Sequence, residues 1–357
     1  MATSRPQPLF YQSSKCVALY LDANIRFQLS LRCPAFQTVH QAATLRIHDL
    51  KMRQDDFVVN DTTFTLGVIQ KYTTTPTPES VKLRNDSGGI QYDVDRYGLS
   101  EEDGIRVKKC KLNNFTLQEE LYIAHRVLER RIYDNRYKAI QLERLAHHMR
   151  LNNQEPPYTH YLQLTMTTGT VQKVERLEYD NNFKISSDYI IEKMFGVARR
   201  KVQIKNLQID REALDLQLMR HFQNAEFLSF AGTGSLKVFN VNQNNRIHFA
   251  KCNDVETDFA DFVNICSKVG QFYSIGFQHQ TTVEEFFEMF RNLPGAETGK
   301  SDESRLSQFP ECIIISMSDE TELNVWFEKT NEEDKVYCNT EFIVKIKVQN
   351  RGHAHVI

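Results

Sequence analysis

Near its start the chain reads PLFYQSSKCVALYLD over residues 8–22 and ANIRFQLSLRCP over residues 23–34. Apolar residues recur three or four positions apart in both stretches, which predicts short amphipathic helices. Tyr20-Leu21-Asp22 closes the first pattern, and Cys33-Pro34 stops the second. Helices of this size do not close a core of their own, so their spare apolar side chains need another surface to cover them.

The composition is that of an ordinary globular protein. The 357 residues are 41% hydrophobic and 25% charged, and this length fits about two or three domains. A net charge of -2 argues against a protein that coats nucleic acid or a membrane surface. No apolar run approaches the roughly 20 residues that a membrane span needs, and residues 1–8 lack the apolar core of a signal peptide. We therefore expect neither a membrane nor a nucleic-acid partner.

The seven cysteines are scattered singly along the chain. Their odd number and wide spacing fit reduced thiols better than a disulfide framework. This usage predicts a cytoplasmic or nuclear protein.

The first half of the chain alternates between strand-like and irregular patterns. Short alternating runs over residues 45–68 predict strands. Residues 73–104 are rich in Gly and Pro with little periodicity, which predicts a long surface loop or a partly disordered insert. Thr116 and Glu119 form a capping box, which predicts that a long helix over residues 116–151 begins there.

The second half predicts a mixture of strands and helices. Residues 162–179 predict a hairpin, and residues 187–195 a helix. Ile204, Leu207 and Ile209 have the spacing of leucine-rich repeats, with irregular relatives at 227–230 and 236–239. A second capping box at Thr282 predicts a helix to Leu293. Three strand-like runs then predict an antiparallel meander at 312–316, 322–328 and 341–349.

These patterns together predict an α+β protein. We expect a helical segment over residues 1–45, and a mixed segment of strands, loop and long helix over residues 46–155. An α/β domain over residues 156–352, with irregular leucine-rich-like strands, then completes the chain.

Several residues suggest chemistry, yet each has a plainer interpretation. Residues 232–235, GTGS, resemble a phosphate-binding loop but lack its Lys and third Gly, so we expect a turn between strands. The adjacent His147 and His148 suit a solvated helix end. Two imidazoles on an extended tail, at His353 and His355, make only a weak metal site.

A zinc site and a basic patch are two further alternatives. The zinc candidates are scattered and include no C-x-x-C pair; they are His248, Cys252, Cys266 and His279. Residues 199–201, Arg-Arg-Lys, lie near acidic residues and lack interleaved aromatics, which favours a solvated face over nucleic-acid binding. We expect no catalytic, cofactor-binding or metal-binding residues.

Several ordered segments carry a resemblance to a known family. Residues 20–26, YLDANIR, with Arg32-Cys33-Pro34, resemble two signatures of the nematode-expanded F-box C family. Residues 88–95, GGIQYDVD, resemble that family's Gly-Gly-x-x-Tyr-Asp-x-Asp segment. Shorter matches follow in the same order and extend the resemblance over nearly the whole chain; they lie at 156–159, 207–209, 323–325 and 348–352.

The resemblance implies a substrate-recognition subunit of a Skp-cullin-F-box ubiquitin ligase, without catalysis of its own. The F-box-like helices would hold a Skp-type adaptor, and an associated domain of unknown function would choose an unknown target protein. The implied adaptor contacts are Pro8, Leu9, Val17, Leu21, Ile25 and Leu29. The Trp that often follows the second F-box helix is absent, and Phe36 stands nearby.

Two alternatives remain open at this stage. The apolar residues of the helices could simply pack them onto the rest of this protein. The chain could also be an interaction or scaffold domain without a ligase link.

Overall fold

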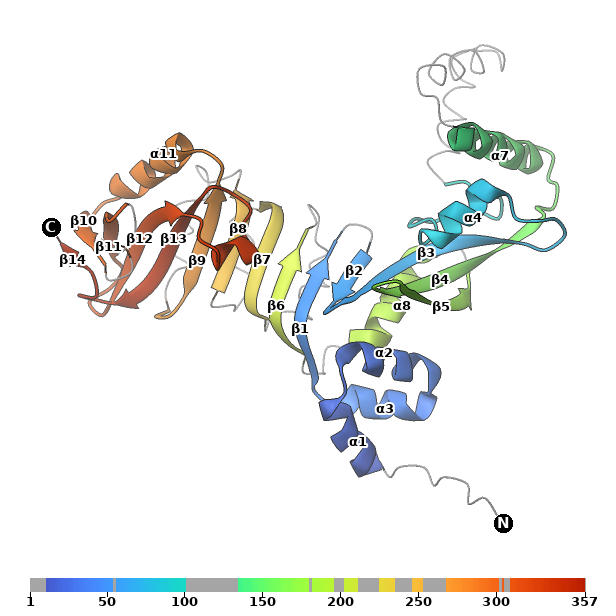
Figure 1. Cartoon of the computed structure of the whole chain (residues 1–357), viewed down its shortest axis with the longest axis horizontal. Helices are drawn as coiled ribbons and strands as arrows, with labels where there is room; N and C mark the ends of the chain where they lie inside the picture. The colour runs from blue at the N-terminus through green and yellow to red at the C-terminus, as the bar shows by residue number, and fades with distance from the viewer. Residues whose placement is uncertain are drawn as a thin grey trace, which may run out of the picture. The chain divides into compact units, whose positions relative to one another are not determined.

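The structure is a computed structural model in which the chain forms two compact units. It describes residues 11–53, 56–100, 134–179, 182–195, 202–210, 225–234, 246–252, 268–301, 304 and 309–356. Unit 1 comprises residues 1–60 and 195–357, and unit 2 comprises residues 61–194. The fold is α+β, with a helical N-terminus followed by strands (Figure 1). The expected domain boundaries at residues 45 and 155 stay predictions.

Unit 1 begins with three helices and continues into a sheet. The helices are α1 (Tyr11–Tyr20), α2 (Ala23–Arg32) and α3 (Pro34–Ala42). The strands are β1 (Leu45–Met52), β2 (Asp56–Val59), β6 (Val202–Ile209), β7 (Ala225–Gly234), β8 (Arg246–Cys252), β9 (Phe272–Phe277), β10 (Ala296–Lys300), β11 (Cys312–Ser316), β12 (Thr321–Lys329), β13 (Phe342–Asn350) and β14 (His355–Val356). Helix α11 (Gln280–Arg291) and a 3-10 turn, η3 (Asp334–Val336), complete the described elements.

A row of parallel strands, β1, β6, β7, β8 and β9, forms one half of this sheet. The apolar spacing of β6 matches that of β1, since Ile204 pairs with Ile47 and Leu207 pairs with Leu50. The row of apolar pairs continues across the sheet as Leu207, Leu228, Ile247 and Tyr273. The repeat-like spacing read at Ile204, Leu207 and Ile209 thus belongs to stacked parallel strands, while the expected relative at 236–239 lies outside the described residues.

The other half of the sheet is antiparallel. Strands β11, β12 and β13 form the predicted meander, and β13 pairs with β9 to join it to the parallel row. Helix α11 packs on β9, β10, β12 and β13 (Figure 1). It buries Val283, Phe286, Phe287 and Phe290 there, because these side chains share one face at helical spacing.

Unit 2 contains a three-stranded antiparallel sheet and three helices among the described residues. Its elements are β3 (Thr62–Tyr72), α4 (Glu79–Asp86), α7 (Asp134–Leu151), β4 (Tyr158–Thr168), β5 (Val171–Glu178) and α8 (Phe183–Phe195). Strand β4 pairs with β3 along its whole length and with β5 through the predicted hairpin. A core cluster joins α7 to the sheet through Ala146, Met149 and Tyr158, together with Tyr97 and Leu99.

The prediction of a loop over residues 73–104 is wrong for residues 79–86, which form α4. The helix is held by tertiary contacts that periodicity does not show: Val81 is buried, and the Asn85 side chain donates to the backbone oxygen of Gln70 at 2.8 Å. Of the predicted helix 116–151, the structure describes α7, and residues 116–133 lie outside the described residues.

Two further local predictions are corrected. The helix predicted to begin at Thr282 begins at Gln280, and its N-cap is His279, so Thr282 lies inside the first turn. The turn predicted at residues 232–235 is strand as far as Gly234, because β7 continues through an irregularity in its register with β8 between Phe230 and Thr233.

Candidate protein-binding surface

The three N-terminal helices pack through small and aliphatic side chains. Ala18 of α1 meets Val39 and Ala43 at the end of α3, and Phe36 packs against this cluster. Phe27 of α2 is fully buried and meets the ring of His40 edge-on, with centroids 5.8 Å apart. The helices are therefore fixed to one another by a small core of their own and by contacts of α2 with β1.

A buried arginine completes this packing. The guanidinium of Arg26 donates to the backbone oxygens of Thr44 at 2.7 Å, Ala43 at 3.0 Å and His40 at 3.1 Å. These carbonyls lie at the end of α3, where helical carbonyls lack intrahelical partners and a cation is favoured. Burial lowers the pKa of Arg26 to about 10, so the side chain remains charged at neutral pH. Arg26 thus ties α2 to the carboxyl end of α3.

Asp22 and Asn24 tie the same helix to the strands. One carboxylate oxygen of Asp22 caps α2 by accepting from the backbone N–H of Asn24 at 2.8 Å. The other accepts from the amide of Asn60 at 3.0 Å. The Asn24 side chain donates to the backbone oxygen of Val59 at 3.1 Å. The polar residues of the 20–26 signature are therefore anchors inside unit 1.

Several aliphatic side chains of α1 and α2 near these anchors are exposed. Val17, Ile25 and Leu29 are 43%, 48% and 38% exposed, and Leu21 is half-buried. Ile25 and Leu29 are one helical turn apart on α2, so they share a face that the buried Arg26 does not occupy. We call Val17, Leu21, Ile25 and Leu29 the apolar surface. Pro8 and Leu9, the other expected adaptor contacts, lie outside the described residues.

Sequence reasoning missed the part played by Asn60. Its side-chain oxygen accepts from the backbone N–H groups of His48 and Asp49, both at 3.1 Å, while its amide reaches Asp22. The residue has a positive φ of 53°, which Asn tolerates better than most residues. The position of Asn60 directly after a strand indicates a turn residue. The sequence does not reveal its bonding partners, because they lie 11 to 38 residues away.

The residues that suggested chemistry are not brought together in the described structure. His248 is buried in β8 beside Ser274, whereas His279 lies at the N-cap position of α11. His148 is exposed at the end of α7, and His355 belongs to β14, which pairs with β10. Within the described ranges no three His, Cys, Asp or Glu side chains gather as a metal site. Cys266 and residues 199–201 lie outside those ranges.

No protein-family model, curated protein or solved structure matches this chain. None of the helices in the described ranges is both long and apolar enough to cross a membrane.

Proposed function

We propose that this protein is a non-catalytic substrate-recognition subunit of a Skp-cullin-F-box ubiquitin ligase, acting in the cytoplasm or nucleus. Its N-terminal helices bind a Skp-type adaptor through the apolar surface, and the remainder of the chain selects the target protein. The proposal extends the F-box C resemblance of the sequence. The observation that carries it is the exposure of Val17, Ile25 and Leu29 on helices that hydrogen bonds of Asp22, Asn24 and Arg26 hold in place.

The division of labour within the 20–26 signature supports this proposal. Asp22, Asn24 and Arg26 stabilise the position of α2, because each bonds to backbone or side-chain atoms within unit 1. Ile25 lies between Asn24 and Arg26; its aliphatic side chain forms no hydrogen bond and is half exposed. Burying a large aliphatic side chain is worth about 1.5–3 kcal/mol, so a partner that covers Ile25 would gain free energy of this size.

The same exposure disfavours the alternative in which these side chains pack the helices onto the rest of the protein. Ala18 and Val39 instead pack the helices on one another, and Phe27 meets the ring of Phe195 beyond them; all three are buried. A partner that brings a ubiquitin-carrying enzyme close to a bound target raises the effective concentration of the reacting groups. A recognition subunit of this kind therefore needs no catalytic residue of its own.

The test is binding of the full-length protein to purified Skp-type adaptor, measured by calorimetry. The variant Leu21→Asp/Leu29→Asp should weaken binding by roughly a hundredfold or more, since two apolar contacts are lost and two charges are buried. Ile25→Asp alone should weaken it by roughly tenfold or more. Val171→Asp changes a more exposed aliphatic residue, on β5, and this variant should bind as the unmodified protein does.

Circular dichroism of each variant separates lost binding from lost folding. A folded double variant that binds the adaptor normally would contradict the assigned surface. A folded full-length protein that does not bind any Skp-type adaptor would favour the alternative of a scaffold without a ligase link.

A further inference from the structure

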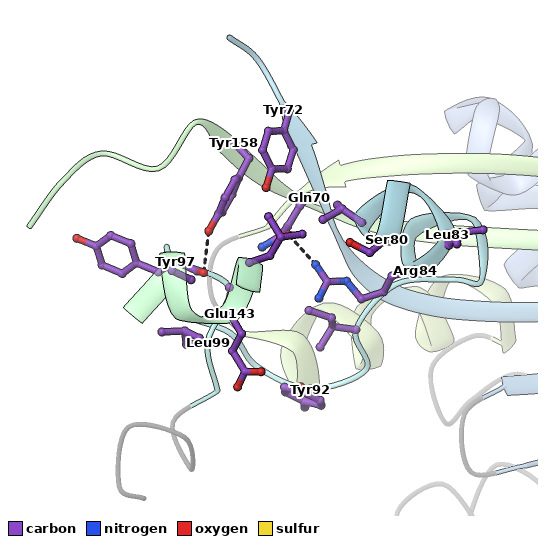
Figure 2. Close-up of a pocket in the computed structure, with 15 residues that line it drawn as sticks. Gln70, Tyr72, Ser80, Leu83, Arg84, Tyr92, Tyr97, Leu99, Glu143 and Tyr158 are labelled. Atoms are coloured by element: carbon purple, nitrogen blue, oxygen red, sulfur yellow. Dashed lines mark hydrogen bonds between the residues drawn. The ribbon is translucent and has the colours of Figure 1, made fainter. Parts of the chain in front are cut away.

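Unit 2 contains a pocket of about 480 Å³ that the proposed function does not use. It is formed by β3, β4, α4, α7 and the segment between residues 90 and 99. Figure 2 shows Arg84 reaching from α4 toward Gln70, with Tyr72 and Tyr158 on one side and Tyr92 on the other. A volume of this size accommodates a small organic group.

Two hydrogen-bond donors in this pocket are buried without partners. Nε of Arg84 and Oγ of Ser80 have no hydrogen-bond partner among the described residues. They lie four residues apart on α4, so both belong to the helix face that lines the pocket. A buried donor that lacks an acceptor has lost its hydrogen bond to water without replacement, and a bound acceptor would restore that bond.

The rest of the Arg84 side chain is already held in place. Its Nη2 donates to Oε1 of Gln70 at 2.6 Å, which fixes the plane of the guanidinium. Burial lowers the pKa of Arg84, although nearby tyrosines and Glu143 oppose that shift. The guanidinium is therefore a preorganised cation that has lost part of its hydration, and such a group binds an oxyanion strongly.

Aromatic rings form the wall beside this cation. Tyr72 and Tyr158 lie with their ring centroids 5.0 Å apart, and the Tyr158 hydroxyl donates to the backbone oxygen of Tyr97 at 2.9 Å. Burial raises the pKa of Tyr72, so its hydroxyl is protonated at neutral pH and carries no repelling charge. This wall offers ring faces and edges to an apolar or aromatic group.

One acidic residue also lines the pocket. Glu143 of α7 is exposed, and its carboxylate is the negative group that an anion would meet. Its charge opposes anion binding from solvent, where screening keeps the effect small. Removing this charge should therefore raise the affinity for an anion, whereas removing a donor such as Arg84 should lower it.

We infer that this pocket binds an oxyanion, a carboxylate or a phosphate monoester, that is attached to an aromatic or apolar group. Arg84 and Ser80 donate to the oxyanion, and the tyrosine wall contacts the attached group. The site lies in unit 2 and uses none of the residues of the apolar surface, so it does not rest on the proposed ligase function. The chemistry fits both a free small molecule and a group carried by a peptide.

The experiment is calorimetric titration of the full-length protein with benzoate, phenyl phosphate, inorganic phosphate and neutral benzamide. Benzoate or phenyl phosphate should bind at least roughly tenfold more tightly than benzamide, because only the oxyanions accept charge-assisted bonds from Arg84. Inorganic phosphate should also bind more weakly, because it does not contact the tyrosine wall. Benzamide binding as well as benzoate, or no detectable binding of either aromatic oxyanion, would overturn the inference.

Variants assign the binding to the named residues. Arg84→Gln should weaken aromatic oxyanion binding by roughly tenfold or more, and Ser80→Ala by a smaller factor of about three to ten. Glu143→Gln should tighten it by about twofold. Lys82→Gln removes an exposed cation from the same helix and should leave the affinity unchanged within measurement error.

Two peptide arms distinguish the sources of the ligand. One peptide ends in Phe with a free carboxylate, and its control carries a terminal amide; the other contains an internal phosphotyrosine. Tighter binding of either peptide than of benzoate and phenyl phosphate supports the site as a peptide pocket, and tighter binding of the small molecules supports a metabolite site. If Arg84→Gln does not fold, Ser80→Ala and Glu143→Gln still test the site. Unchanged affinity for the aromatic oxyanions in both variants would overturn the assignment of binding to this pocket. Adaptor binding should be unaffected by any of these variants, which separates this test from that of the proposed function.

Discussion

Nδ1 of His248 lies 2.9 Å from Oγ of Ser274, its register partner on the adjacent parallel strand. Both side chains are completely buried. The other ring nitrogen of His248 has no hydrogen-bond partner among the described residues, and the ring meets Tyr337 edge-on with centroids 4.8 Å apart. Burial lowers the pKa of His248 to about 4, although the charge of Asp334 opposes this shift.

This buried imidazole predicts an acid-sensitive unit 1. Below its ordinary pKa of about 6.5, His248 takes up a proton in the unfolded chain but not in the folded one, until the pH reaches about 4. The unfolded state therefore binds more protons in this window, and the free energy of unfolding falls as the pH falls from 6.5 to 4. The full loss is roughly 3 kcal/mol.

The measurement is urea unfolding followed by the fluorescence of Trp326 at a series of pH values. Trp326 is the one tryptophan of the chain and lies in unit 1, so it reports this unit and not His160 of unit 2, whose pKa is also lowered to about 4. His248→Gln should flatten the dependence on pH between 6.5 and 4. An unchanged slope in that variant would contradict the assignment to His248.

Removal of the Arg26 guanidinium should destabilise unit 1 and displace α2. Arg26→Met leaves the carbonyl oxygens of His40, Ala43 and Thr44 without this donor, at an expected cost of about 3 kcal/mol. Arg26→Lys keeps the charge but not the fork of donors, so an intermediate loss is expected. Chemical denaturation followed by Trp326 fluorescence measures both.

Arg46→Met is the matched control, because Arg46 is exposed on β1. Its expected effect on the free energy of unfolding is within about 0.5 kcal/mol. Equal stability of the Arg26→Met and Arg46→Met proteins would show that the three carbonyl bonds contribute nothing net.

A side chain at Gly67 should destabilise unit 2. A Cβ built on Gly67 lies 2.1 Å from the backbone oxygen of Gly88, and Val68 next to it exchanges backbone hydrogen bonds with Ile90. Gly67→Ala must therefore push the 88–90 segment away from β3, at an expected cost of about 1–3 kcal/mol. Hydrogen exchange of the Ile90 amide, which donates to Val68 at 2.8 Å, should quicken in this variant.

Lys71→Ala alters an exposed side chain of the same strand and is the comparison for this effect. Its amide exchange at Ile90 should match that of the unmodified protein. Protection of Ile90 that survives in Gly67→Ala would mean that the segment adjusts without losing its pairing.

The sequence allowed the strands to be predicted well wherever burial alternates. Ile204, Leu207 and Ile209 have a spacing that identifies one buried face, and all three are buried in β6. The pairing of β6 with β1 was not predictable, because the two strands are far apart in the sequence and either could have accepted another neighbour. Periodicity specifies a face of a strand and not its partner.

The candidate surface was predictable to a similar extent. The aliphatic positions Val17, Ile25 and Leu29 follow from helical spacing and the family resemblance, and the structure leaves them exposed. The function of Asp22 as an anchor did not follow, since Asn60 lies 38 residues away. The role of Arg84 in the pocket was not predicted. Its helix, α4, has only eight residues and lies in a stretch rich in Gly and Pro, so it is too short to show a recognisable helical periodicity.

The discontinuity of unit 1 bears on how the chain is made. Strand β1 leaves the ribosome long before β6, so the nascent chain carries the N-terminal helices and β1 with one strand edge unpaired while residues 61–194 are synthesised. Pairing across so long a separation is slow, and an unpaired apolar strand edge invites association with other chains. The β1–β6 pairing thus sets a period during translation in which one edge of β1 is open to association with other chains.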